Sequence, residues 1–353
     1  MTTTEVEIRL FNPQTATDAE WIAFNTFKNA ALAERQPDDP PRTVEQRQVD
    51  LRNIPPMFQV RHWLAWDAGH STVIAVAALI LIEMEENRHV AQFELDVLPA
   101  YRRQGLGSRL LGLLADQAQA SQRRLLIIET HGAVPAGDAF MAHVGAHLAL
   151  ESHINQLDLA ELDRDLLHAW QTDARHAGFT LGLWAGPYPE ADIDAIVELV
   201  KAANDAPKGD LDLNDFEWTA EQLREQEAAR QARGLERWTM YVRETATGEL
   251  AGYTEVFWDP GKPALLEQGF TAVWPRYRGH ALGRRLKAAM LDKVLRERPQ
   301  VRYVRTGNAD SNAAMLKINA DLGFRPYQSD NVWQIEVERV KEYLATRAGA
   351  AGA

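Results

Sequence analysis

The sequence repeats itself once, with a constant spacing of 176 residues between Arg102 and Arg278. The segment "LDVLPAYRRQGLGSRLLGLLADQ" at 95–117 aligns without a gap to "TAVWPRYRGHALGRRLKAAMLDK" at 271–293. A repeat of this period is too long for a solenoid, whose units run to about 20–50 residues, and therefore indicates a duplicated domain. The 353 residues are enough for two domains that each bury a core of their own.

The pattern of apolar residues predicts the same order of elements in each half, and hence an α+β fold with a mixed sheet in each. The first half is predicted to have strands at 6–11, 58–67, 72–84, 89–98, 125–130 and 154–159 and helices at 18–35, 44–53, 106–120 and 136–144. The second is predicted to have strands at 179–184, 238–244, 249–258, 265–273, 301–306 and 332–337 and helices at 192–203, 220–233, 282–295 and 312–322. We therefore expect domains at 1–159 and 178–353, joined by a charged helical linker at 160–177.

Composition narrows the classes of partner. The net charge is −12, and no basic run exceeds Arg123-Arg124, which disfavours nucleic acid because phosphate neutralisation supplies most of that binding. An acidic surface suits a cationic amine, although solubility alone also explains it. No signal peptide precedes the first strand and the longest apolar run, 72–82, is too short to cross a membrane, so we expect a cytoplasmic protein without membrane partners. The sequence predicts no oligomeric state.

The repeated turn lies between the end of an apolar strand and the start of a helix. Free backbone N–H groups and a partial positive charge at that helix end suit a phosphate, and glycines let the backbone approach it. The alternative is an ordinary helix cap with glycines for a sharp turn. Neither G-x-x-x-x-G-K-[ST] nor a G-x-G-x-x-G opening a βαβ unit is present. The candidate phosphate-binding residues are Arg102, Arg103, Gln104, Gly105, Leu106, Gly107 and Ser108, and in the second copy Arg278, Gly279, His280, Ala281, Leu282, Gly283 and Arg284.

The motif R-x-x-G-x-G after V-x-P-x-Y resembles the pyrophosphate-binding motif of the GNAT superfamily of acyl-CoA-dependent N-acyltransferases. The order of strands and helices in both halves is similar to that fold as well, so the chain resembles a tandem GNAT protein with a mycothiol-synthase-like duplication. The resemblance implies acetyl-CoA as cofactor and two strands that splay apart to admit its pantetheine arm. Leu95, Asp96, Val97 and Val273 would then offer backbone groups to that arm.

Further family features differ between the halves. The segment "TGNADSNAAMLKINADLGFRPY" resembles the family's approach to the helix near the CoA thiol, which implies that Asn308 and Asn312 contact cofactor or substrate. Many members carry a tyrosine general acid four residues before the closing Gly-Phe turn. Met141 and Asn319 occupy those positions here, which puts such an acid in doubt in both halves.

Transfer of an acyl group to an amine requires a group that accepts a proton. Glu94 and Glu129 interrupt apolar strands in the first half and Glu255 and Glu267 do so in the second, so each is a candidate base; the alternative for each is an outward-facing strand residue. His131 is a further candidate. We expect no metal site, because Gly145 separates His143 from His147 where the helix should end.

These features favour transfer of acetyl from acetyl-CoA to a small-molecule primary amine. Transfer would be direct, in a ternary complex, since the chain has no cysteine to carry the acyl group. A non-catalytic acyl-CoA sensor or scaffold is the alternative of a different class, supported by the missing tyrosines. A transferase that uses aminoacyl-tRNA is disfavoured by the acidic charge. We expect the first half to bind CoA more tightly, because Arg103 and Gly105 stand where the second has Gly279 and Ala281.

Overall fold

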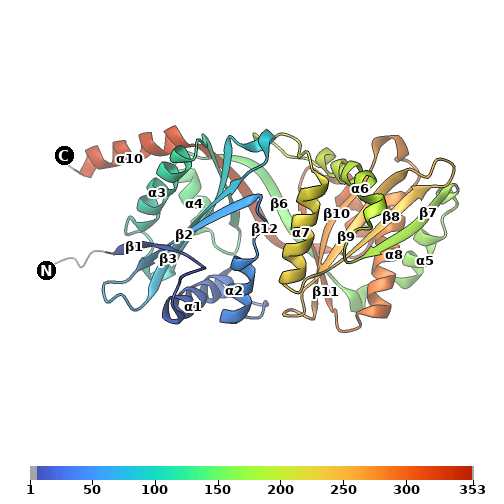
Figure 1. The fold of residues 1–353 in the computed structure, drawn as a ribbon, viewed down its shortest axis with the longest axis horizontal. Helices are drawn as coiled ribbons and strands as arrows, with labels where there is room; N and C mark the ends of the chain where they lie inside the picture. The colour runs from blue at the N-terminus through green and yellow to red at the C-terminus, as the bar shows by residue number, and fades with distance from the viewer. Residues whose placement is uncertain (1–5, 352–353) are drawn as a thin grey trace. The chain divides into compact units, whose positions relative to one another are not determined.

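The computed structural model describes residues 6–351, with side chains through residue 349 (Figure 1). The strands are β1 (Glu7–Phe11), β2 (Phe58–Trp66), β3 (Val73–Ile82), β4 (Val90–Val97), β5 (Leu125–His131), β6 (His147–Asp158), β7 (Phe179–Ala185), β8 (Glu236–Glu244), β9 (Leu250–Trp258), β10 (Leu265–Val273), β11 (Tyr303–Ala309) and β12 (Arg325–Glu336). The α-helices are α1 (Asp18–Arg35), α2 (Val44–Arg52), α3 (Leu106–Ala120), α4 (Ala136–His143), α5 (Arg164–Gln171), α6 (Ile193–Val200), α7 (Ala220–Ala232), α8 (Leu282–Glu297), α9 (Ala313–Asp321) and α10 (Val337–Ala351). None of these helices combines the length and apolar composition that a membrane span requires.

Three helices begin at the same local signal. Thr17, Thr43 and Thr219 each accept a hydrogen bond from the backbone three residues on, and the Glu or Gln there reaches back to the threonine N–H. These capping boxes satisfy backbone groups that would otherwise lack a partner, which explains why α1, α2 and α7 start where they do.

The chain forms two compact units, each with its own mixed sheet between two layers of helices. The first sheet has the order β1-β2-β3-β4-β5-β12, with α1 and α2 on one face and α3, α4 and α10 on the other. The second has the order β6-β11-β10-β9-β8-β7, with α6 and α7 on one face and α5, α8 and α9 on the other. The predicted α+β class with a mixed sheet in each half is confirmed.

The two units exchange their last strands. The first unit contains Met1–Glu151, Asp210–Asn214 and Asp330–Ala353, and the second contains Ser152–Gly209 and Asp215–Ser329. β12 therefore pairs antiparallel with β5 of the first half, while β6 pairs from Ser152 onward with β11 of the second. The predicted boundaries at 159 and 178 differ from these units, because duplication gives both closing strands a similar pattern and tertiary pairing decides between them.

The segment predicted as a linker is part of the second unit's core. Leu162 precedes α5, and Leu167 and Trp170 lie on it; all three are buried with residues of α8. Burial of such side chains contributes roughly 1.5–3 kcal/mol each, so the segment holds the unit together rather than bridging two domains.

Helix α10 was not predicted from the sequence. It runs antiparallel to α3, as Figure 1 shows: Lys341 contacts Asp116, Leu344 packs at Gly112, and Arg347 reaches Ser108 at the helix start. A Cβ at Gly112 would lie 2.9 Å from the Leu344 side chain, so glycine there allows the close packing. The last turn of α10 is thereby held at the first turn of α3.

The expected divergence of two strands is present in each unit. β4 pairs with β5 only over Val90–Gln92 and β10 pairs with β11 only over Leu265–Glu267, after which each pair of parallel strands separates. The remaining residues of β4 and β10 therefore have one edge without a strand neighbour within their unit. Such an edge can accept an extended amide chain as an added strand.

Both repeated turns adopt the same unusual backbone. Arg103 and Gly105 have positive φ angles of 62° and 83°, and their counterparts Gly279 and Ala281 have 87° and 56°. Each turn thus has two left-handed residues of which only one is glycine, and the glycine occupies opposite positions in the two copies. A side chain in this region costs roughly 1–2 kcal/mol, so each turn carries one strained residue.

We predict opposite effects of two substitutions in the second turn. Ala281→Gly should stabilise the protein by up to about 1 kcal/mol because it removes that strain, and Gly279→Ala should destabilise it by about the same amount. A Cβ at Gly279 would meet no atom within 4 Å, so its effect reports the backbone alone. Urea unfolding measures both; a loss of stability for Ala281→Gly would contradict the interpretation.

Candidate active site

The first repeated turn presents the N-terminus of α3 through Gly105, which precedes the helix with φ 83° and ψ −7°. The first arginine of the turn, Arg102, does not point freely at this helix end. Arg102 Nε donates to the Val97 carbonyl at 2.9 Å, and its two terminal nitrogens pair with both oxygens of Glu34 at 2.8 and 2.6 Å. Arg102 therefore fixes the position of the turn by linking it to β4 through Val97 and to α1 through Glu34.

Two other cations lie at this helix end. Arg103 is exposed and makes no ion pair within residues 6–351. Arg347 Nη1 donates to Ser108 Oγ at 2.8 Å, and its guanidinium is 3.5 Å from where a Cβ of Gly105 would be. Arg103, Arg347 and the free N–H groups of α3 together form a surface suited to phosphate oxygens.

In the described part of the chain, both arginines of the second turn are ion-paired. Arg278 pairs with Asp205 and donates to the Val273 carbonyl at 3.4 Å, which repeats the bracing role of Arg102. Gly279 replaces Arg103, and Arg284 pairs with Asp321 at 3.3 Å. The asymmetry agrees in direction with the expectation that the first turn binds CoA more tightly.

The other predicted cofactor residues occupy structural places in their turns. Gln104 donates to the Ala100 carbonyl at 3.0 Å, and His280 packs on Phe179 with ring centroids 5.2 Å apart. Leu106 and Leu282 are buried first residues of α3 and α8, Gly107 faces Phe140, Gly283 faces Ile318, and Leu95, Asp96 and Val97 line the cavity described below.

The predicted asparagines of the second half have partners in the protein. Asn312 caps α9 by accepting from the Met315 N–H at 3.3 Å. Asn308 accepts from Asn319 at 2.7 Å, and Asn319 in turn accepts from the buried Lys287 at 2.7 Å. Burial lowers the pKa of Lys287 to about 7. The position of the family's tyrosine is thus filled by a closed polar network.

A cavity of about 80 Å³ lies where β4 and β5 separate in the first unit. Its walls include Leu95–Leu98 from β4 and the residues after it, Ile128–His131 from β5, and Met141 from α4. Arg102 lies at one side of it and Glu129 with His131 at another, so cofactor turn and candidate base share one cavity.

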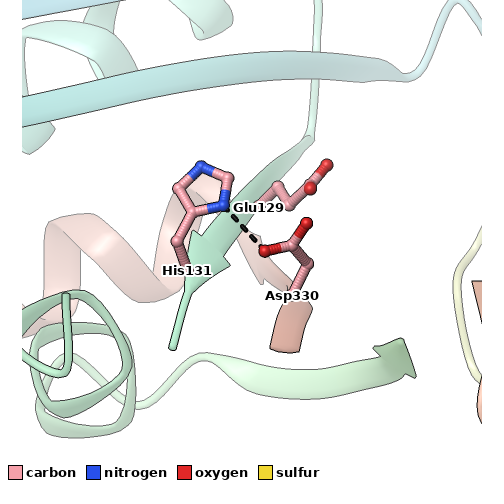
Figure 2. A group of neighbouring side chains, drawn as sticks. All are labelled: Glu129, His131 and Asp330. Atoms are coloured by element: carbon pink, nitrogen blue, oxygen red, sulfur yellow. Dashed lines mark hydrogen bonds and ion pairs between the residues drawn. The ribbon is translucent and has the colours of Figure 1, made fainter. Parts of the chain in front are cut away.

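Glu129, His131 and Asp330 come together at this cavity (Figure 2). Glu129 and His131 are two residues apart on β5, which places their side chains on the same face. Asp330 is directly opposite His131 in the β5–β12 pairing, and its carboxylate lies 2.9 Å from His131 Nδ1. Ligating atoms of the three residues lie within 4.8 Å of one another.

The neighbours of His131 indicate which of its two ring nitrogens carries the proton. Arg35, in the last turn of α1, places Nη1 3.4 Å from His131 Nε2. A guanidinium has only donors, so Nε2 accepts and the proton sits on Nδ1, from which it is donated to Asp330. The Nε2 lone pair is therefore occupied, and His131 is better suited to orient Asp330 than to serve as the base.

Glu129 has the properties of a general base. Partial burial, followed by the negative charge of the Asp330 carboxylate, raises the pKa of Glu129 to about 7. Glu129 is nevertheless exposed, so that a substrate can reach its carboxylate. A carboxylate with a pKa near the working pH combines a large ionised fraction with useful basicity.

The other three candidate carboxylates fit this role less well. Glu94 lies 2.9 Å from Lys28 Nζ, whose positive charge lowers the pKa of Glu94 to about 2. Glu255 has its pKa raised by burial, accepts from the Phe270 N–H, and lies near arginines. Glu267 is an exposed residue of β10, as strand alternation alone would produce. We therefore retain Glu129 of the four.

The same three side chains also have the composition of a cation site. A histidine and two carboxylates can coordinate a divalent metal. The guanidinium of Arg35, however, lies at 3.4 Å from His131 Nε2 and its positive charge opposes a metal ion there. A role in proton transfer is compatible with Arg35 at this distance and is the hypothesis developed below.

Comparison with known proteins places the fold and the family. The model of the Acetyltransferase (GNAT) family matches residues 24–145 and again 193–324. A tandem GNAT protein from the clavulanic acid biosynthesis pathway, solved without AcCoA, is 29% identical, with a TM-score of 0.77 over 94% of this chain and 99% of its own. A GCN5-related N-acetyltransferase from Sphaerobacter thermophilus is 17% identical, with a TM-score of 0.66 over 94% and 96%. No curated protein sequence matches the chain.

Asp330, Arg35 and Arg347 were not predicted as site residues. Asp330 and Arg347 lie in the second half of the sequence and reach the first unit only through the exchange of β12 and α10. One signal was available for α10: Val337, Val340 and Leu344 follow a helical spacing that continues past the last predicted strand.

We predict a pH dependence that follows Glu129. Only the ionised carboxylate accepts a proton. The value of kcat/KM should therefore fall about tenfold for each pH unit below the Glu129 pKa of about 7, and should be constant above it. Glu129→Gln should lower kcat roughly 100-fold or more and remove this limb.

Glu151→Gln is the matched control, since Glu151 is an exposed strand residue of the same unit. It should keep both the rate and the pH limb. Retention of the limb in Glu129→Gln would exclude Glu129 as the base. Loss of activity on treatment of the wild-type protein with EDTA would instead favour a metal at the three residues.

Proposed function

We propose, because the chain belongs to the acetyltransferase (GNAT) family, that it transfers acetyl from acetyl-CoA to a small primary amine at the first unit. The observation that carries the proposal is the convergence of a phosphate-binding helix start, an open strand edge and a base of raised pKa on one cavity. The acceptor amine is proposed as a class only.

The residues of the first unit fit acetyl-CoA. Arg103, Arg347 and the N–H groups of α3 would hold the phosphates, and Gly105 leaves the approach open. The free edge of β4 beyond Gln92 would pair with the amides of the pantetheine arm. When bound, acetyl-CoA supplies an acyl group activated as a thioester.

The chain's own groups would handle the proton and the geometry. An amine reaches the enzyme mostly as an ammonium ion, and Glu129 would take one proton from it to free the nitrogen lone pair for attack on the acyl carbon. Asp330, held by His131 and through it by Arg35, keeps negative charge beside Glu129 and so keeps it basic. Transfer would replace the C–S bond of the thioester by a C–N bond, and the nitrogen loses two protons as it becomes an amide. Glu129 would pass one of them to the departing sulfur, and the other would leave to water.

The small cavity supports a short acyl group. A volume of about 80 Å³ is only a few times the share of liquid volume taken by one water molecule, about 30 Å³. An acetyl group fits such a space, whereas a long acyl chain would require the walls at Phe140 and Met141 to move.

A binding role without catalysis remains the second candidate, and one observation favours it for the second unit. There, Asn319 replaces the tyrosine and is tied to Lys287 and Asn308, while the turn has no unpaired arginine among the described residues. We propose that the second half of the sequence supports the first unit, chiefly by supplying β12 and α10 to it.

The proposal is tested by acetyl-CoA-dependent thiol release with a panel of primary amines. We expect turnover in the wild-type protein, and in Arg347→Ala a rise of about tenfold in the KM for acetyl-CoA with little change in kcat, because a charge-assisted bond to phosphate is lost. Calorimetry should show the same loss for CoA but none for pantetheine, which has no pyrophosphate.

Arg339→Ala is the control on the same helix, because Arg339 is exposed and pairs only with Glu342 among the described residues. It should behave as wild type. Tighter binding of acetyl-CoA to Arg347→Ala would mean that Arg347 blocks the site. Binding of acetyl-CoA without thiol release for any amine would favour the non-catalytic role.

A further inference from the structure

The second unit contains a larger cavity, of about 440 Å³, that the proposed reaction does not use. It is bounded by the end of β7 with Gly186-Pro187, by the last turns of α7, and by the start of β8. This volume lies in the range of about 300–1,000 Å³ typical of sites for small organic ligands.

The cavity is far from the second cofactor turn. That turn follows Val273, which pairs with Gly252, and Gly252 pairs with Val242 near the end of β8. The cavity instead adjoins Arg237 at the start of β8, five residues earlier, which is about 17 Å along a strand. A ligand here would occupy a different place from CoA.

Arg237 is a buried cation at the cavity wall. The residue is 4% exposed, and its Nη2 donates to Glu227 at 2.6 Å and to the Gly186 carbonyl at 2.8 Å. Its guanidinium lies 3.6 Å from the ring centroid of Tyr188, while its buried Nε has no hydrogen-bond partner. The position of this guanidinium is therefore fixed, and part of its donor capacity is unused.

Arg230 provides a second cation from α7. It is one turn from Glu227 on the same helix face, and Nη2 donates to the neutral amide of Gln226. No carboxylate forms an ion pair with Arg230 within the described part of the chain. Burial lowers the pKa of Arg230, because a guanidinium held away from water loses part of its solvation.

The carboxylates around the cavity are already engaged. Glu227 is shared by Arg237 and Arg224, at 2.6 and 2.7 Å, and Glu236 pairs with Arg298. Glu255 acts on both cavity arginines from β9, but burial raises its own pKa and so favours its neutral form. Within residues 6–351, Arg230 is therefore a cation of this cavity that no carboxylate neutralises by direct contact.

We propose that this cavity binds a small organic carboxylate, whose anionic group lies against Arg230 and Arg237 and whose apolar part lies against Pro187 and Leu235. A planar carboxylate matches the donor fork of a guanidinium, and burial strengthens the attraction. The inference does not depend on acyl transfer in the first unit.

The test uses 3-phenylpropionate as the probe and 3-phenylpropionamide as its neutral analogue, with the full chain and without acetyl-CoA. We expect saturable binding of the acid by calorimetry and ligand-observed NMR, and at least tenfold weaker binding of the amide. Arg230→Gln should weaken binding of the acid at least tenfold, because it removes the charge while leaving Arg237 and Glu227 paired.

Arg296→Gln is the matched control, because it removes one positive charge from an exposed arginine of α8 and should leave probe binding unchanged. Arg237→Lys provides a second variant, which keeps the positive charge but loses the two parallel N–H donors of the guanidinium. It should weaken binding of the acid less than Arg230→Gln does. Equal binding of acid and amide, equal affinity in Arg230→Gln and Arg296→Gln, or no saturation at millimolar probe would each overturn the proposal.

Discussion

The candidate active site depends on the antiparallel pairing of β5 with β12. This pairing sets Asp330 directly opposite His131 and, with the two-residue period of a strand, beside Glu129. It is anchored three positions further along β12 by Trp333, which is buried and donates from Nε1 to Thr130 Oγ1 at 2.9 Å. A shift of one residue would turn Asp330 to the other face of the sheet and leave Glu129 without the charge that raises its pKa.

The same exchange gives the cofactor turn its extra cation. α10 follows β12 directly and runs back along α3, so that Arg347 reaches Ser108 while Arg102 is engaged with Glu34. A first unit formed from the first half of the sequence alone would have neither Asp330 nor Arg347. Duplication has thus made the two halves interdependent: the second turn is poor in free cations, but the second half supplies two residues to the first site.

The sequence was informative where a signal is local and less so where it depends on distant pairing. The duplication, the strand-turn-helix at Gly105 and the candidate base Glu129 could all be found from short segments. Asp330 could not, because a lone aspartate near a strand start has no local signature and β6 and β12 have similar patterns. Arg102 shows the converse: its motif position was recognised, but its bidentate partner Glu34 lies 68 residues away.

The central claim, that an exchanged strand sets the basicity of Glu129, is tested most directly by the pH profile of kcat/KM in Asp330→Asn. Burial, the largest cause of the raised pKa of Glu129, remains in this variant, but loss of the neighbouring negative charge should still move the acidic limb from about 7 part of the way toward the ordinary glutamate value of 4.5. The plateau rate should fall because His131 loses its partner. An acidic limb that stays at about 7 in Asp330→Asn would contradict the account, since Glu129 would then owe its pKa to something other than β12.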